Sequence, residues 1–144
     1  MKPRLDLLTL GVRDLDATRR FYVQGLGWPV IADFPGEVIF VQIGHGLLLS
    51  LWDFDHMIEE AGPVGTSPAS ITLGHIVPTE AEVTEVLERA VAAGGALLAE
   101  ATRREWGGLS GYFGDPDGYR WEVAYNPGFQ VAADGTVSLG AVTD

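Results

Sequence analysis

The chain has 144 residues, of which 47% are hydrophobic, which is enough for one compact domain or two small modules with a real core. Its formal net charge is −11, from 20 acidic and 9 basic residues, so nonspecific binding to nucleic acid or to an anionic membrane surface is disfavoured. The absence of cysteine excludes disulfides, thiolate metal sites and thiol nucleophiles.

The first twelve residues contain only a brief apolar run, which Asp6 interrupts. This run is too short for a secretory signal and far short of the roughly 20 apolar residues that a membrane helix needs. We therefore expect a cytoplasmic protein that binds neither nucleic acid nor membrane.

In the first half of the chain, the pattern predicts a strand, a helix and three further strands. Residues 5–12 alternate in the manner of a strand, and Asp14 is a candidate N-cap for a helix that ends at Gly25 and Gly27. The three strands that follow are expected over residues 29–34, 38–43 and 47–52, separated by Pro-Gly and Gly-rich turns.

The second half is predicted to repeat the order β-α-β-β-β. Before it, residues 53–70 break the pattern, with a short helix ending at Gly62 and then a connector. Thr79 and Glu82 form a capping-box pattern in front of a helix with regular apolar spacing. The four strands around that helix are expected over residues 71–77, 96–101, 109–113 and 119–125, with a further short strand over 136–139.

The last two strands of this half are joined by the sequence DPDG, residues 115–118. Proline fixes φ, aspartate side chains accept hydrogen bonds from nearby amides, and the glycine tolerates a positive φ, so these residues form a turn. In the strand after the turn, Trp121 and Val123 lie on the face expected to pack in the core. Glu122 lies on the opposite face, and it is the first functional candidate.

The paired β-α-β-β-β modules and three motifs together resemble the vicinal oxygen chelate superfamily, which includes glyoxalase I, extradiol dioxygenases and bleomycin-resistance proteins. The motifs are LGVRDLDATRRFYVQGLGW, EVTEVLERAVAAGG and FGDPDGYRWEVAYNP, and the resemblance covers residues 5–127. It implies an α+β fold in which two βαβββ modules form an open, barrel-like cleft that holds a small molecule. The expected organisation is a single domain, residues 1–144, with modules at 4–55 and 69–128, a connector at 56–68 and a C-terminal extension at 129–144.

Metal-using members of that superfamily hold one divalent ion at four cleft-facing positions, on the first and last strands of each module. By resemblance these positions fall on Leu7, Ser50, Thr72 and Glu122. Only Glu122 offers a charged donor, whereas a divalent cation needs several His or carboxylate ligands. We therefore expect no cofactor, and a divalent metal held through Glu122 is the disfavoured alternative.

The other residues expected to bind the ligand are aromatic or weakly polar, and strand alternation or a loop position directs them toward the cleft. They are Thr9, Trp52, Trp106, Ser110 and Tyr112. Together with the four positions above they predict a pocket for a flat or hydrophobic molecule. Two alternatives stay open: the aromatic walls fill a collapsed cleft, or they face a partner subunit.

Glu122 is predicted to act either as a general base or as a hydrogen-bond acceptor for the ligand. The alternative is a former ligand position that now pairs with Arg120 or another side chain. His75 is expected to be a core histidine, because alternation puts it on the face that packs against the helix. His56 follows two aspartates, but aspartate at the start of a helix is expected to act as a cap rather than as a metal ligand.

Three functions fit these features. The first and favoured one is a metal-free binding protein of the bleomycin-resistance type, a homodimer that holds a small molecule. The second is an enzyme of the glyoxalase or dioxygenase type, a lyase or dioxygenase that uses Glu122. The third is a module whose aromatic surface binds another protein. Whether the protein is an enzyme stays open at this point.

Overall fold

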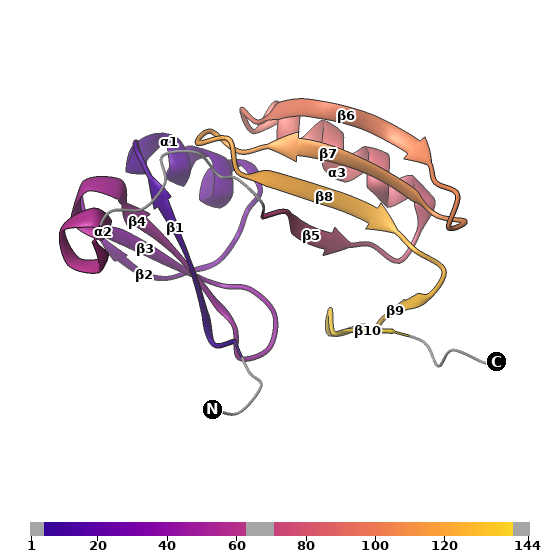
Figure 1. Cartoon of the computed structure of the whole chain (residues 1–144), viewed down its shortest axis with the longest axis horizontal. Helices are drawn as coiled ribbons and strands as arrows, with labels where there is room; N and C mark the ends of the chain where they lie inside the picture. The colour runs from indigo at the N-terminus through magenta and orange to yellow at the C-terminus, as the bar shows by residue number, and fades with distance from the viewer. Residues whose placement is uncertain (1–4, 63–70, 140–144) are drawn as a thin grey trace. The chain divides into compact units, whose positions relative to one another are not determined.

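The computed structural model describes residues 5–62 and 71–139 (Figure 1). Its contacts divide the chain into two compact units, Met1–Ala69 and Ser70–Asp144, which we call unit 1 and unit 2. Residues 63–68 of the predicted connector and residues 140–144 of the predicted extension lie outside the described residues, and the single-domain organisation stays a prediction.

Unit 1 has the predicted order of one strand, one helix and three strands. Its elements are β1 (Leu7–Val12), α1 (Leu15–Arg19), the π-helix η1 (Arg20–Gly25), β2 (Val30–Phe34), β3 (Val38–Gln42), β4 (Leu48–Asp53) and α2 (Phe54–Ala61). The strand order in the sheet is β1-β4-β3-β2, with β1 parallel to β4 and the other pairs antiparallel. The sequence pattern did not distinguish the π-helical turn from the α-helix before it.

The core of unit 1 lies between the first helix and one face of this sheet. Asp14 caps α1 as predicted, with its side chain accepting a hydrogen bond of 2.9 Å from the Ala17 amide. Trp28 packs on the ring of Tyr22, with 5.1 Å between centroids. The apolar side chains that the sheet buries on this side are Leu10, Val12, Ile39, Val41, Leu49 and Leu51.

Unit 2 repeats the topology of unit 1. Its elements are β5 (Leu73–Ile76), α3 (Glu80–Ala92), β6 (Ala96–Arg103), β7 (Leu109–Gly114) and β8 (Arg120–Tyr125), followed by the hairpin of β9 (Phe129–Val131) and β10 (Val137–Leu139). The sheet order is β5-β8-β7-β6, with β5 parallel to β8. Two open four-stranded sheets with the same connectivity confirm the predicted α+β fold (Figure 1).

The core of unit 2 forms where α3 packs on β6, β7 and β8. Thr79 caps the helix, because its hydroxyl oxygen accepts a hydrogen bond from the Glu82 amide and its hydroxyl donates to the Glu82 carboxylate. Trp121 is buried as predicted, and its ring stacks on that of Phe113 at 6.1 Å. Burial of these large side chains is the main stabilising contribution in this unit.

The predicted turn between β7 and β8 is present and sets the register of the two strands. One oxygen of Asp115 accepts hydrogen bonds from the amides of Asp117 and Tyr119, at 3.0 and 2.8 Å, and Gly118 has a φ of 87°. This register places Tyr112 directly opposite Glu122.

The prediction that His75 is a core residue is wrong. The residue shares a sheet face with Val123, as expected, but it is exposed. The reason is that β5 pairs only with β8 within the described sheet, while α3 packs mainly over the other three strands.

Within the described residues, no helix is long and apolar enough to cross a membrane.

Candidate functional site

The predicted site residues of unit 2 lie on the face of its sheet opposite α3, which we call the helix-free face. Tyr112 and Ser110 come from β7 and Glu122 from β8, and Tyr112 pairs with Glu122 across the two strands. Residues two apart on a strand point to the same side, so the three side chains share this face. They alternate with Phe113, Trp121 and Val123, which are buried in the core.

A hydrogen-bonded network joins these residues and adds one that the sequence did not indicate, Arg104. The Tyr112 hydroxyl donates to Oε1 of Glu122 at 2.9 Å. Arg104 Nε donates to the Ser110 hydroxyl at 2.8 Å, and its Nη2 donates to the Ser110 carbonyl at 3.3 Å. The Arg104 guanidinium carbon also lies 5.9 Å from the centroid of the Tyr112 ring, within the range of a cation–π contact.

The environment of Tyr112 keeps its phenol protonated. Burial raises the pKa of Tyr112, and the hydrogen bond to Glu122 and the charge of that carboxylate raise it further, while Arg104 and Ser110 act in the opposite direction. Tyr112 is therefore a neutral donor at physiological pH, and it orients the Glu122 carboxylate.

The predicted site residues of unit 1 line a hollow of about 390 Å³. It contains all four that the sequence indicated in this half, Leu7, Thr9, Ser50 and Trp52. The strand register explains this grouping, because Thr9 on β1 and Phe40 on β3 both lie beside Ser50 on β4. The hollow is also lined by five residues that the sequence analysis missed: Phe34, Glu37, Val38, Phe40 and Glu60.

The two remaining predicted residues lie at the ends of strands. Thr72 is exposed and lies outside the sheet, because β5 begins at Leu73, whereas the predicted strand over residues 71–77 included Thr72. Trp106 belongs to the turn between β6 and β7 and is 46% exposed. Its ring occupies the space where a side chain at Gly108 would be, so it packs directly on that backbone.

Phe40 and Arg104, neither of which was predicted as a site residue, differ in whether the sequence pattern indicated their position. Phe40 lies two residues after Val38 on β3 and alternates with the buried Ile39 and Val41, so the strand periodicity alone indicated which side it faces. Arg104 carried no such signal. It stands at the base of a turn in which the Arg104 amide donates to the Gly108 carbonyl and the Gly107 amide donates to the Arg104 carbonyl. Only this geometry brings the guanidinium back onto the sheet.

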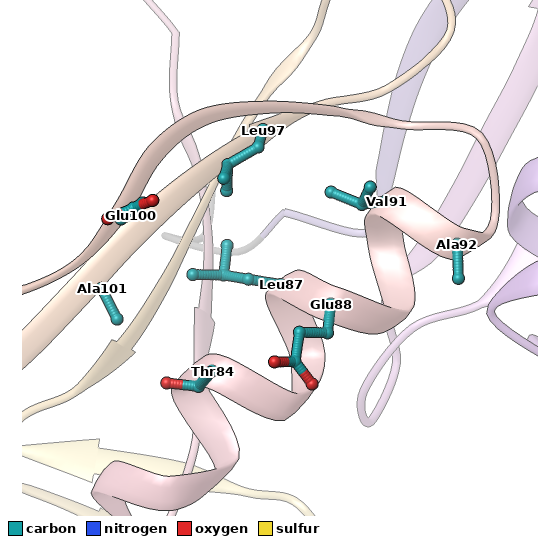
Figure 2. Close-up of a pocket in the computed structure, with 8 residues that line it drawn as sticks. All are labelled: Thr84, Leu87, Glu88, Val91, Ala92, Leu97, Glu100 and Ala101. Atoms are coloured by element: carbon teal, nitrogen blue, oxygen red, sulfur yellow. The ribbon is translucent and has the colours of Figure 1, made fainter.

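A second hollow, of about 540 Å³, lies between α3 and the edge strand β6 (Figure 2). Leu87 and Val91 of the helix and Leu97 of the strand supply its apolar lining. Glu88 and Glu100 add carboxylates to its lining. No residue that the sequence analysis selected lines this groove.

The donor set does not fit the divalent ion that metal-using relatives of this fold hold. Of the four positions, leucine offers no donor, serine and threonine offer only neutral hydroxyls, and the Glu122 carboxylate already accepts a hydrogen bond from Tyr112. Across residues 5–62 and 71–139, no three His, Asp or Glu side chains gather in a metal-binding group.

Asp53 caps α2, because its side chain accepts a hydrogen bond of 3.1 Å from the His56 amide, as predicted for the start of that helix.

Comparison with known proteins agrees with this topology. Residues 4–123 match the family model described as Glyoxalase/Bleomycin resistance protein/Dioxygenase superfamily. The chain is 43% identical to a glyoxalase-related enzyme from Fulvimarina pelagi, with a TM-score of 0.90 and coverage of 96% of this chain and 99% of that one. Among curated proteins, no sequence matches.

More distant structures share the same fold. A glyoxalase/bleomycin resistance protein/dioxygenase from Nocardioides is 26% identical, with a TM-score of 0.72 and coverage of 92% and 91% of the two chains. A lactoylglutathione lyase from Agrobacterium tumefaciens is 24% identical, with a TM-score of 0.68 and coverage of 87% and 95%. The chain belongs to the Glyoxalase/Bleomycin resistance protein/Dioxygenase superfamily.

Proposed function

We propose that this protein binds a flat or hydrophobic small molecule and does so without a metal ion. The observation that carries the proposal is the hollow of unit 1, where Trp52, Phe34 and Phe40 supply aromatic walls and Ser50 and Thr9 supply isolated hydroxyls. Its volume of about 390 Å³ lies within the range of small-molecule sites. A mostly apolar lining with a few polar groups favours a ligand of the same character.

The metal-free part of the proposal rests on the donor set. Three of the four positions that would ligate a metal carry Leu7, Ser50 and Thr72, and the fourth, Glu122, is hydrogen-bonded to Tyr112. A carboxylate that is held by a phenol donor suits hydrogen bonding to a polar group.

Tryptophan fluorescence tests the proposed hollow. Titration with bleomycin and with the neutral aromatic compound 2-naphthol is expected to quench emission saturably with at least one of them. The quenching should disappear in Trp52→Phe and persist in Trp106→Phe, because only Trp52 lines the hollow. Saturable quenching that survives in Trp52→Phe would place the ligand elsewhere, and no saturable quenching by either compound would refute this binding function.

A second candidate is an enzyme of the glyoxalase type in which Glu122 acts as a general base or as a metal ligand. It is favoured by the 43% identity to a protein described as a glyoxalase-related enzyme. Elemental analysis after dialysis separates the two. A stoichiometric amount of Zn, Ni, Mn or Fe, lost in Glu122→Gln, would overturn the metal-free proposal, whereas a metal content near zero supports it.

The proposal includes a homodimer and a cytoplasmic location, both of which stay predictions. The chain has a mass of 15.4 kDa, so light scattering coupled to gel filtration should give twice that value for the dimer. A value equal to one chain would reject it.

A further inference from the structure

Arg104 is a positive charge on the helix-free face that no carboxylate neutralises within the described residues. Its hydrogen bonds go to the hydroxyl and the carbonyl of Ser110, both neutral. By contrast, Arg19 is bound to Asp33, and Arg103 is bound to Glu80. In a chain with 20 acidic and 9 basic residues, a partly buried arginine without an acidic partner is a candidate anion-binding group.

The guanidinium is held in place before any ligand binds. Ser110, which receives both hydrogen bonds, is 1% exposed, and the Tyr112 ring lies 5.9 Å from the guanidinium carbon. The side chain starts from a tight turn closed by hydrogen bonds of 2.9 and 3.0 Å between Arg104, Gly107 and Gly108. A guanidinium has five N–H groups, and the two bonds to Ser110 leave others to donate to a ligand. Because little side-chain entropy is lost on binding, such an arginine favours affinity.

Tyr112 links this cation to the Glu122 carboxylate. The guanidinium stands over the ring of Tyr112, and the hydroxyl of the same ring donates to Glu122. A positive and a negative group are thus presented on one sheet face, with an aromatic ring in contact with both. A ligand complementary to this arrangement has an anionic group for Arg104 and a hydrogen-bond donor for Glu122.

We propose that Arg104 and Glu122 form a recognition site for a small organic acid, with Arg104 binding its carboxylate and Glu122 accepting a hydrogen bond from its hydroxyl or amino group. The inference rests on the proposed small-molecule-binding function and names the class of ligand that these residues of unit 2 would recognise. A carboxylate matches the planar fork of a guanidinium. The net charge of −11 disfavours a dianionic phosphate relative to a monoanionic carboxylate.

The test compares two probes of equal shape, 4-hydroxybenzoate and the neutral 4-hydroxybenzamide, by isothermal titration calorimetry. The wild type should bind the acid more tightly than the amide. Arg104→Gln should weaken binding of the acid about tenfold or more, the size expected for lost hydrogen bonds to a charged group, and leave the amide nearly unchanged. Arg104→Lys, which keeps the charge and loses the fork, should fall between the two.

Arg120→Gln is the matched control, because it removes an exposed arginine two residues from Glu122 and changes the net charge by the same amount. It should change the affinity for the acid by less than about twofold, since long-range electrostatic effects are screened at physiological salt. Thermal melting of each variant checks that the fold is kept. If Arg120→Gln weakens binding of the acid as much as Arg104→Gln does, the effect is one of net charge and the inference fails.

The remaining outcomes separate this inference from the function on which it rests. Equal affinity of the wild type for acid and amide, unchanged in Arg104→Gln, would overturn the anion site and leave the binding function standing. Tighter binding of phenyl phosphate than of 4-hydroxybenzoate would overturn the choice of a carboxylate. Absence of binding to every one of these probes would overturn the inference, whereas the binding function is judged by the fluorescence titration with 2-naphthol and bleomycin.

Discussion

The Tyr112 hydroxyl donates a hydrogen bond of 2.9 Å to Oε1 of Glu122, across a directly paired position of β7 and β8. The one acidic residue that the sequence placed on the ligand-facing side is therefore oriented by a neutral donor. The sequence analysis allowed Arg120 or another side chain as its partner, and the partner is Tyr112. This arrangement allows the role of the carboxylate to be separated from its contribution to stability.

Glu122→Gln is expected to leave the free energy of unfolding within about 0.5 kcal/mol of the wild type, because an amide oxygen still accepts the Tyr112 hydrogen bond. Tyr112→Phe should cost about 1 kcal/mol, because it removes the donor from a partly buried carboxylate. Chemical denaturation measures both values. A large loss of stability in Glu122→Gln would show that the residue is structural, and the site assignment would then be wrong.

Gly111→Ala is expected to destabilise unit 2 by about 1–3 kcal/mol, the usual range for overpacking. A Cβ at this position would lie 2.9 Å from the Ala99 carbonyl oxygen and 3.0 Å from the Ala101 amide nitrogen, both backbone atoms of β6, and would also meet the Leu87 side chain. Gly74→Ala, in β5, is the control, since its Cβ would meet nothing within 4 Å. Equal unfolding free energies for the two variants would contradict the close packing of α3 on β7.

His75 is expected to make stability depend on pH. The side chain of His75 is exposed, but the neighbouring protein still removes part of the water around the imidazole, and this desolvation lowers the pKa of His75 against a smaller opposing effect of Glu82. The unfolded chain therefore takes up a proton more readily than the folded one. The contribution of His75 is therefore fully present above the unfolded pKa of about 6.5 and is lost as the pH falls through that value toward the folded pKa.

Thermal melting of wild type and His75→Gln between about pH 7.5 and 5.5 measures this contribution. The variant should lose less stability on acidification than the wild type does. If His75→Gln and the wild type show the same pH dependence, His75 does not carry the effect.

Asp33 is expected to stabilise unit 1 through its paired hydrogen bonds with Arg19, both of 2.9 Å. The hydrogen bond from Arg19 is the main cause that lowers the pKa of Asp33, and the positive charge of Arg19 adds to it. The contribution is thus present above the unfolded pKa of about 3.9 and is lost as the pH falls through the lower folded pKa.

Asp33→Asn should cost up to about 1 kcal/mol of unfolding free energy at neutral pH, the upper end for a surface pair with good geometry. Asp16→Asn removes the other carboxylate that binds Arg19. The side chain of Asp16 is 78% exposed, against 31% for Asp33, so this substitution should cost less stability. Denaturation at pH 7 compares the two variants. A larger cost for Asp16→Asn would contradict the assignment of the stabilising pair.

The sequence determined the repeated βαβββ order because each signal behind it is local. Thr79 and Asp14 cap their helices, the DPDG turn has its own hydrogen bonds, and strand alternation separates buried from unburied positions such as Trp121 and Glu122. The same alternation explains why Leu7, Thr9, Ser50 and Trp52, chosen from separate strands, line one hollow.

The tertiary structure alone decided which side chains meet. The exposure of His75 depends on which strands α3 covers, the π-helical turn η1 has no distinct residue pattern, and Arg104 reaches Ser110 and Tyr112 only because a turn reverses the chain between β6 and β7. Periodicity reports the face on which a residue lies. Coverage of that face depends on residues distant in the chain, and contacts across a turn depend on the backbone geometry of the turn.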